Sequence, residues 1–224
     1  MPMTTAAVIS NPRIAADLGF LGEWLEDRGI GVHRLIRDDV LAPDAADDAD
    51  VLIVMGSIWT LADGHRTDEY PNAIDAEIDL VQRWVLDDRP MLGICFGGQV
   101  LSTALGGTVT RMPQRMIAWQ TPASSESAVR APWALWHEDR FTIPDKVEAL
   151  AIAPHAPMAI RSQRAWGVQF HPEFTADIIT SIAQDLHTPD EHAQPMIDVA
   201  RERAADQRQE SAALFDAWWA DVHR

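Results

Sequence analysis

The sequence contains a single cysteine, Cys95, which lies between two glycines in the run Met91-Leu-Gly-Ile-Cys-Phe-Gly-Gly-Gln99. Glycines two residues before and two residues after a nucleophile relieve crowding at a sharp strand-to-helix turn, so that the nucleophile projects above the sheet. The N-terminus of a helix just beyond Cys95 would favour the negative charge of a thiolate. The run therefore predicts a nucleophile elbow. Taken alone, a tight turn around an inert buried thiol is an equal alternative.

A second candidate segment, Val168-Gln-Phe-His-Pro-Glu173, ends an apolar run with a histidine and places a glutamate two residues later. A thiol nucleophile needs a base, and the base needs a group that orients its ring and stabilises the imidazolium. Residues two apart in an extended chain point to the same side, so Glu173 is expected to reach the ring nitrogen of His171 that faces away from Cys95. The sequence thus predicts a catalytic triad of Cys95, His171 and Glu173.

A third candidate segment, Val54-Met-Gly-Ser57, follows an earlier apolar run. Ligands of open α/β sheets bind at the carboxyl ends of the strands. We expect the main-chain N–H of Gly56, or of its neighbour Ser57, to form an oxyanion hole together with the N–H of Phe96. A plain glycine turn at the end of a strand is the alternative.

Short apolar runs and longer amphipathic stretches alternate along the chain, which predicts one doubly wound α/β domain with a mostly parallel sheet and helices on both faces. The region from 108 to 164 is interrupted by prolines and is expected to be a β-rich insertion of antiparallel strands and loops. The expected strands are residues 6–10, 32–36, 51–55, 91–94 and 165–170, and the expected helices are residues 14–28, 72–86, 99–105 and 175–186.

The segment 189–224 is expected to be a long charged helical stretch whose apolar residues gather on one face near its end: Leu214, Phe215, Trp218, Trp219 and Val222. A helix of this kind more often packs on its own domain than on a partner. We therefore expect a catalytic domain over residues 1–186 and, over residues 187–224, a C-terminal helical extension that packs on the same domain.

The composition of the chain indicates which partners and which cellular location are expected. The formal net charge is −16 and Lys146 is the only lysine, which disfavours nucleic acid and anionic membranes as partners. No apolar run approaches the roughly 18 residues that a membrane span needs, and the N-terminus lacks the basic region of a secretory signal. A single cysteine permits no internal disulfide, so a cytoplasmic location is expected.

The elbow run with Gln169-Phe-His-Pro-Glu173 resembles the class-I, or triad, glutamine amidotransferases, and the separation of 76 residues between Cys95 and His171 is similar to that family. The resemblance extends over residues 6–182. It implies a flavodoxin-like fold and hydrolysis of the glutamine side-chain amide through a γ-glutamyl thioester. By position it implies that Cys95 is the nucleophile, His171 the general base and acid, and Glu173 the orienting group.

The resemblance also implies that Gly56 and Phe96 are oxyanion donors and that Gln99 and Ser57 contact the substrate, glutamine or another γ-glutamyl compound. The family commonly has His where Gly98 stands and Gly where Glu138 stands, so substrate contacts are expected to differ. No Gly-rich phosphate loop appears, so any ammonia must go to a separate synthetase or to solvent.

No cofactor is expected, and no metal site either. His187 and His192 are five residues apart, which is not the i, i+4 spacing of a helical zinc site.

Two other functions stay open. A γ-glutamyl peptidase would use the same triad and thioester but release an amine or a peptide. A catalytically silent regulatory module would use the Trp-rich C-terminal helix as its interface and leave Cys95 unreactive.

Overall fold

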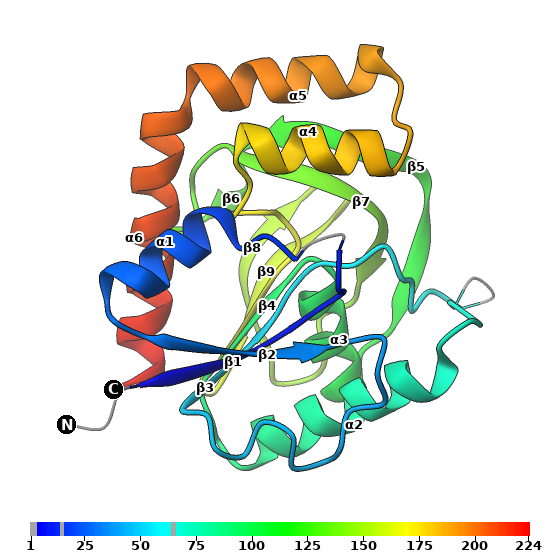
Figure 1. Ribbon diagram of the computed structural model, residues 1–224, viewed down its shortest axis with the longest axis vertical. Helices are drawn as coiled ribbons and strands as arrows, with labels where there is room; N and C mark the ends of the chain where they lie inside the picture. The colour runs from blue at the N-terminus through cyan, green and yellow to red at the C-terminus, as the bar shows by residue number, and fades with distance from the viewer. Residues whose placement is uncertain (1–3, 14–15, 64–65) are drawn as a thin grey trace.

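A computed structural model describes residues 4–13, 16–63 and 66–224 of the chain. Its centre is an eight-stranded sheet with the strand order β2-β1-β3-β4-β10-β9-β8-β6 (Figure 1). The first five strands in this order pair in parallel and the last three pair antiparallel. The strands are β1 (Thr5–Ser10), β2 (Gly31–Ile36), β3 (Val51–Val54), β4 (Met91–Ile94), β6 (Ala123–Ser124), β8 (Glu148–Ala153), β9 (Ala156–Ser162) and β10 (Ala165–Val168).

Helices cover both faces of this sheet, because successive strand residues are apolar on both sides. Val8 and Ile53 pack with α1 (Gly19–Asp27) and α6 (Ala204–Val222) in one core cluster. Ile9 and Leu52 pack with α2 (Pro71–Leu86) and α3 (Phe96–Ala104) in another. The predicted fold class, a doubly wound flavodoxin-like α/β sheet, is confirmed.

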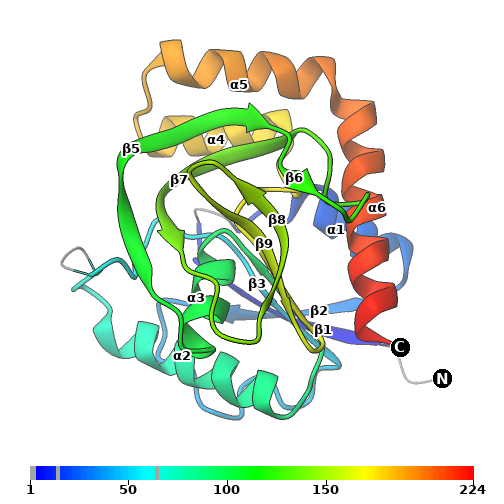
Figure 2. The ribbon, with the colours of Figure 1, turned by 180° about the vertical axis from the view of Figure 1, so that it is seen from behind.

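A second layer lies above the antiparallel half of the sheet. The strands β5 (Val109–Gln120) and β7 (Trp133–Phe141) form a separate antiparallel pair. The helices α4 (Ala176–Asp185) and α5 (Asp190–Glu202) cover this pair, as the view from behind shows (Figure 2). The expected β-rich insertion therefore contributes to both sheets, since β6, β8 and β9 extend the central sheet and β5 with β7 form the second one.

The C-terminal stretch differs from the single helical segment that its pattern suggested. It forms two helices, α5 and α6, which meet at Arg203 and run in different directions (Figure 1). The backbone of Arg203 leaves helical geometry with φ −101° and ψ 12°. The two helices pack on different partners, α5 on β5 and α6 on α1, which a straight helix could not reach.

The last helix is closely joined to the sheet. Leu214, Phe215, Trp218 and Val222 are fully buried. The indole Nε1 of Trp218 donates a hydrogen bond to the carbonyl oxygen of Met91 at 2.9 Å, at the start of the central strand β4. Residues that follow the segments of Cys95 and His171 in the sequence thus complete the core around them.

Two helix starts also differ from expectation. The helix after the elbow begins at Phe96 rather than at Gln99, so it starts directly behind Cys95. The first helix begins at Gly19 rather than at residue 14, and residues 14–15 of the expected span lie outside the described residues.

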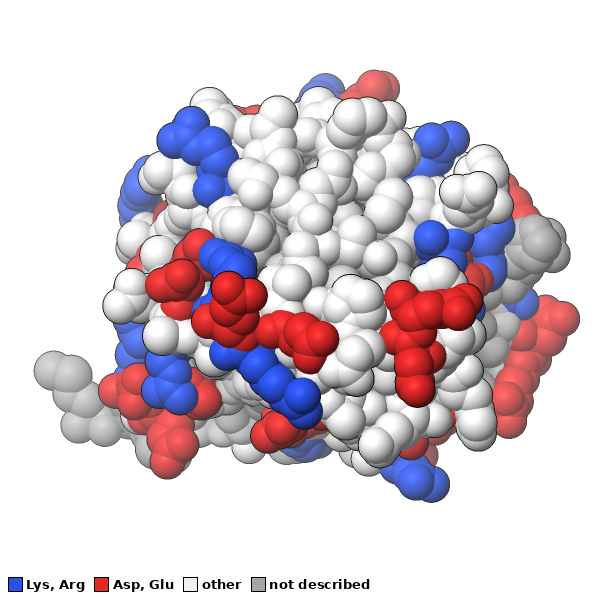
Figure 3. Space-filling model, turned by 90° about the horizontal axis from the view of Figure 1, so that it is seen from above, with Lys and Arg blue, Asp and Glu red and all other residues white. Residues whose placement is uncertain are grey.

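The surface carries charges of both signs. On the face seen in Figure 3, acidic and basic side chains lie next to each other around uncharged areas, and the described residues of that face form no continuous basic patch. Within the described part of the chain, none of the helices combines the length and the apolar character that crossing a membrane requires.

Candidate active site

Cys95 lies at the junction of β4 and α3 in a strained conformation. Its backbone has φ 52° and ψ −103°, in a region that residues other than glycine rarely occupy. A Cβ added to Gly97 would lie 2.0 Å from the carbonyl oxygen of Val54, and one added to Gly93 would lie 2.4 Å from the carbonyl oxygen of Gly97. Both glycines are therefore required for the close approach of strand and helix that holds Cys95 in place.

His171 and Glu173 form a buried pair beyond the end of β10. The Nδ1 of His171 lies 2.8 Å from Oε1 of Glu173, and both side chains are almost completely buried. The imidazole ring stacks on Phe174 with a centroid distance of 3.9 Å. The backbone N–H of His171 donates to the carbonyl oxygen of Ala134 at 2.9 Å, which ties the segment to β7. The ring is thus held from one edge, one face and the main chain.

Cys95, His171 and the turn at Gly56 meet at one point. A Cβ added to Gly56 would lie 3.1 Å from Cε1 of His171 and 3.7 Å from Cβ of Cys95. A side chain at this position would press on the imidazole ring of His171, which would have to shift by a few tenths of an ångström. The structure therefore brings together the residues predicted as the triad and one of the two residues predicted as oxyanion donors, while Phe96, the other, directly follows Cys95.

The charge state of His171 follows from its neighbours. Burial alone would lower the pKa of His171, but the charges of Glu173 and Cys95, together with hydrogen bonds to both, raise the pKa to about 10. This balance favours the protonated, imidazolium form of His171. His171 can then give a proton to a leaving group on the side of Cys95.

A buried arginine that the sequence analysis did not identify supports the turn at Gly56. The guanidinium group of Arg37 donates to the carbonyl oxygens of Met55 and Gly56, each at 2.9 Å. It is also paired with Glu77 and lies 4.8 Å from the ring centroid of Phe96. Arg37 directly follows β2 at the carboxyl end of a parallel strand, and this position is the signal that could have identified it.

The two predicted substrate-binding residues lie beside Cys95 in different roles. The Oγ of Ser57 donates to Oδ1 of Asn11 at 2.6 Å and accepts from the N–H of Trp59, so this side chain holds its own loop. Gln99 is buried, and its Nε2 lies 3.4 Å from Oε1 of Gln169, whose own Nε2 donates to Sγ of Cys95 at 3.6 Å. Gln99 therefore reaches the thiol through a second glutamine that the sequence analysis did not identify.

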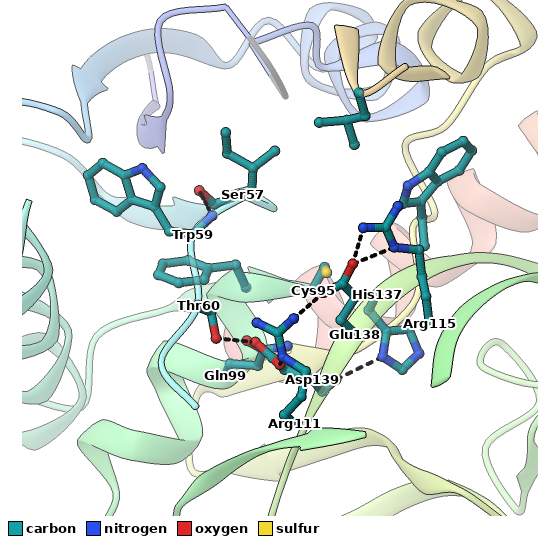
Figure 4. Close-up of a pocket in the computed structure, with 14 residues that line it drawn as sticks. Ser57, Trp59, Thr60, Cys95, Gln99, Arg111, Arg115, His137, Glu138 and Asp139 are labelled. Atoms are coloured by element: carbon teal, nitrogen blue, oxygen red, sulfur yellow. Dashed lines mark hydrogen bonds and ion pairs between the residues drawn. The ribbon is translucent and has the colours of Figure 1, made fainter. Parts of the chain in front are cut away.

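A pocket of about 250 Å³ opens next to Cys95 and is lined by Ser57, Gln99 and several charged groups (Figure 4). The carboxylate of Glu138 lies between the guanidinium groups of Arg111 and Arg115 and forms ion pairs with both. Oδ1 of Asp139 lies 2.7 Å from Nε of Arg111, and Oδ2 of Asp139 accepts a hydrogen bond from the hydroxyl group of Thr60. Charges of both signs in one wall suit a ligand that is itself a zwitterion, such as the α-amino and α-carboxyl groups of an amino acid.

His137, from the segment Trp136-His-Glu-Asp139, is a neutral acceptor in the same wall. Its Nδ1–H donates to the carbonyl oxygen of Asp139 at 2.8 Å, and its buried Nε2 has no hydrogen-bond partner among the described residues. Burial, assisted by the charges of His155 and His171, lowers the pKa of His137 to about 4 against the effect of the bond to Asp139. Burial also raises the pKa of Asp139, against the opposing effects of Thr60 and Arg111.

The family model described as "Glutamine amidotransferase class-I" matches residues 46–181. The matched region is more than half of the chain and includes Cys95, His171 and Glu173. The chain belongs to the class-I glutamine amidotransferase family. It is accordingly a glutamine amidotransferase-type enzyme, and residues 182–224 lie outside the matched region.

Two curated relatives illustrate the range of this amidotransferase family. The glutamine amidotransferase-like protein YfeJ of Salmonella typhimurium is 28% identical over 176 residues, which cover 72% of this chain and 73% of that protein. The glutamine-hydrolysing GMP synthase of Vibrio parahaemolyticus is 37% identical over 97 residues, which cover 38% of this chain but only 19% of the synthase. The matched region therefore spans about a fifth of the longer relative.

Solved structures show the same fold over the whole amidotransferase chain. A glutamine amidotransferase from Thermotoga maritima has a TM-score of 0.83 at 18% identity and covers 97% of this chain and 99% of its own. A glutamine amidotransferase from Methylobacillus flagellatus has a TM-score of 0.76 at 21% identity, and the match covers 99% of this chain and 95% of that protein. At these identities the comparison concerns the fold alone, and it includes the C-terminal helices.

Proposed function

We propose that the chain hydrolyses the side-chain amide of glutamine to glutamate and ammonia, with Cys95 as the nucleophile. The observation that carries this proposal is the meeting of a strained, glycine-flanked Cys95 with a His171 whose far nitrogen is held by Glu173 at 2.8 Å. A nucleophile, its base and an orienting carboxylate in this order are the parts that acyl transfer requires. Membership in the class-I glutamine amidotransferase family supports the choice of substrate.

In the first half-reaction the thiolate of Cys95 attacks the amide carbon of the glutamine side chain, and the proton of the thiol resides on His171. The carbonyl oxygen becomes an oxyanion as the carbon turns tetrahedral. The N–H groups at Gly56, or its neighbour Ser57, and at Phe96 are the proposed donors to this oxyanion. The carbonyl oxygens of Met55 and Gly56 accept hydrogen bonds from Arg37, so the orientation of the peptide planes in this turn is fixed before substrate arrives.

Collapse of the intermediate breaks the carbon–nitrogen bond. His171 gives its proton to the departing nitrogen, which leaves as ammonia, and a γ-glutamyl thioester remains on Cys95. His171 then takes a proton from water, the water oxygen attacks the thioester carbon, and the proton returns to the sulfur as glutamate leaves. Glu173 holds the ring throughout, and its charge stabilises the imidazolium.

The acceptor of the ammonia is proposed to be the active site of a separate synthetase. This proposal is supported by relatives that carry a matching region within a longer glutamine-hydrolysing GMP synthase. It is also supported by a solved neighbour described as a GMP synthase subunit, which shares this fold with a TM-score of 0.60.

The proposed function is tested by measuring glutamate release from glutamine by the purified protein and by Cys95→Ala. We expect turnover by the wild-type protein and a loss of about 10⁴-fold or more in the variant, because the nucleophile is removed. Cys95→Ser, which keeps a hydroxyl at the same place, is a matched variant and is expected to lose nearly as much. Activity in Cys95→Ala close to that of the wild type would rule out Cys95 as the nucleophile, and a wild-type protein that acts only on a γ-glutamyl dipeptide would indicate a peptidase.

A further inference from the structure

A second, smaller pocket adjoins the first one beside Cys95 and shares part of its lining, including Ser57 and Leu186. Its volume is about 50 Å³, and it opens between the turn at Gly56 and the C-terminal end of α4. Two of the residues that line it, Phe174 and Ile182, are buried in the core. At its opening, Leu186 is half-buried and Ile58 is exposed.

The two pockets differ sharply in charge. The larger one is lined by Arg111, Arg115, Glu138 and Asp139. None of the described residues that line the smaller one is an acid, a lysine or an arginine, and His171 is its only titratable group apart from Cys95 itself. An ionised group would lose its hydration in the smaller pocket without gaining a partner, whereas an alkyl group would be stabilised there.

The chemistry of the proposed reaction decides which half of the substrate occupies each pocket. The departing nitrogen must lie next to His171, which protonates it, and His171 lines only the smaller pocket. The zwitterionic end of the glutamyl group matches the charges of the larger pocket. The bond to be broken then lies over Cys95, with the acyl side toward Arg111 and the leaving group toward Ile182.

We propose that the smaller pocket is a subsite for the substituent on the leaving nitrogen, so that the enzyme also hydrolyses γ-glutamyl amides of small, uncharged alkyl amines. This inference rests on the proposed function and extends its substrate class. A cavity needs roughly 10–15 Å³ to admit one water molecule, so a pocket of about 50 Å³ has room for about three non-hydrogen atoms. Methylamine and ethylamine fit this limit as leaving groups.

The test compares substrates that share the γ-glutamyl half and differ only in the leaving amine. These are glutamine, γ-glutamyl methylamide, γ-glutamyl ethylamide and γ-glutamylglycine, with glutamate release as the readout and Cys95→Ala as the blank. We expect kcat/KM for the two alkyl amides to lie within about tenfold of that for glutamine, because the added methyl and ethyl groups bury apolar surface. For γ-glutamylglycine, whose carboxylate would enter the apolar pocket, we expect a value lower by roughly 100-fold or more.

Variants locate the alkyl group. Ile182→Phe reduces the space in the smaller pocket and is expected to lower the ratio of ethylamide to glutamine kcat/KM by about tenfold or more. Ser181→Phe is the matched control, because Ser181 is the exposed neighbour on α4 and does not line the pocket; its ratio is expected to equal that of the wild type. Leu186→Phe, at the half-buried rim, is the second variant if Ile182→Phe does not fold.

The outcomes separate the two proposals. Hydrolysis of glutamine without hydrolysis of either alkyl amide would overturn the alkyl subsite and leave the glutamine amidohydrolase intact. Preference for γ-glutamylglycine over the alkyl amides would also overturn the subsite. If none of the four compounds released glutamate, both the proposed function and the subsite would be overturned.

Discussion

The guanidinium group of Arg37 and the carboxylate of Glu77 form a two-pronged ion pair in the protein interior. Nε lies 2.8 Å from Oε2 and Nη2 lies 3.0 Å from Oε1, and both side chains are at most 1% exposed. The same guanidinium holds the carbonyl oxygens of Met55 and Gly56. Glu77 neutralises the charge, while Arg37 fixes the turn beside Cys95, so the pair has one role in stability and another in the proposed catalysis.

A double-mutant cycle on this pair separates the two roles. Arg37→Met leaves the carboxylate of Glu77 buried without its partner, and Glu77→Leu does the same to the guanidinium group of Arg37. Each single variant is expected to lower the free energy of unfolding by about 3–5 kcal/mol. The double variant removes both charges, so we expect it to recover part of that loss. Its kcat is expected to remain at least about tenfold below the wild type, because the Met55 and Gly56 carbonyls have lost their donor.

Urea unfolding and steady-state kinetics on the four proteins provide the measurement. If kcat returned to the wild-type level in the double variant together with stability, Arg37 would have no positioning role beyond its contribution to folding. A KM that rises while kcat stays constant would likewise contradict a role at the oxyanion.

Removing the charge of Glu173 should change the pH dependence of activity. In Glu173→Gln the imidazolium of His171 loses the negative charge that raises its pKa, so the alkaline limb of kcat/KM is expected to move to lower pH by about 1–3 units. The loss in kcat should be smaller than that of Cys95→Ala, because an orienting group contributes less than the nucleophile.

Asp177→Asn is the matched control for this pH profile. Asp177 is exposed on α4 only four residues away, so its neutralisation changes the net charge equally. An equal displacement of the alkaline limb in both variants would show that the effect is one of overall charge and not of the His171–Glu173 contact.

His137 is expected to make the protein sensitive to acid. The pKa of this histidine is about 4 in the folded protein and about 6.5 in an unfolded chain. Between these values the unfolded state binds a proton that the folded state does not, so the free energy of unfolding falls as the pH is lowered from 6.5 toward 4. At pH 4.5 the free energy of unfolding that is lost through His137 is on the order of 2–3 kcal/mol.

His137→Asn, which keeps a donor for the Asp139 carbonyl, should reduce this acid loss of stability. The measurement is urea unfolding of both proteins at pH 7 and pH 4.5, where the groups they share cancel in the difference. His33→Asn replaces an exposed histidine on β2 and serves as the control, for which no such change is expected. An identical acid loss in the His137 variant and in the wild type would disprove that His137 is kept neutral by burial.

Trp218 should be among the most important side chains for stability. It is fully buried, and its Nε1 bonds the Met91 carbonyl oxygen. Trp218→Ala leaves a large cavity and is expected to cost about 3–5 kcal/mol in urea unfolding. The neighbouring Trp219 is only partly buried, so Trp219→Ala is the control, with an expected cost of no more than about 1–2 kcal/mol. Equal costs would mean that the end of α6 does not pack on the sheet as described.

The sequence predicts the local parts of this structure well and the long-range parts poorly. The strained turn at Cys95 could be predicted because Gly93 and Gly97 lie within two residues of it, and their need for close approach is a local property. The pairing of Arg37 with Glu77 spans 40 residues and depends on how α2 packs, which no local pattern encodes. The roles of Arg111 and Arg115 depend on an irregularity in the β5–β7 register between Arg111 and Met116, which also has no local signal.

The C-terminal helices illustrate the same limit. The charged pattern of residues 189–224 predicts helix, but it does not predict where the helix breaks, because Arg203 is an ordinary helix-forming residue. The break becomes necessary only because α5 packs on β5 while α6 packs on α1. The catalytic roles of Cys95 and Glu173 are predictions that the variants of these two residues test.

The hydrogen bond between Trp218 and Met91 joins residues 127 positions apart and has a consequence for biosynthesis. While the nascent chain is still on the ribosome, β4 and β10 can emerge and pair, but the face of the sheet that α6 covers stays open to water. Trp24 and its apolar neighbours remain uncovered until synthesis has passed Val222 and that stretch has cleared the exit tunnel. Cys95 thus leaves the ribosome long before α6 can cover the sheet, and chaperones have a defined apolar surface to shield during that interval.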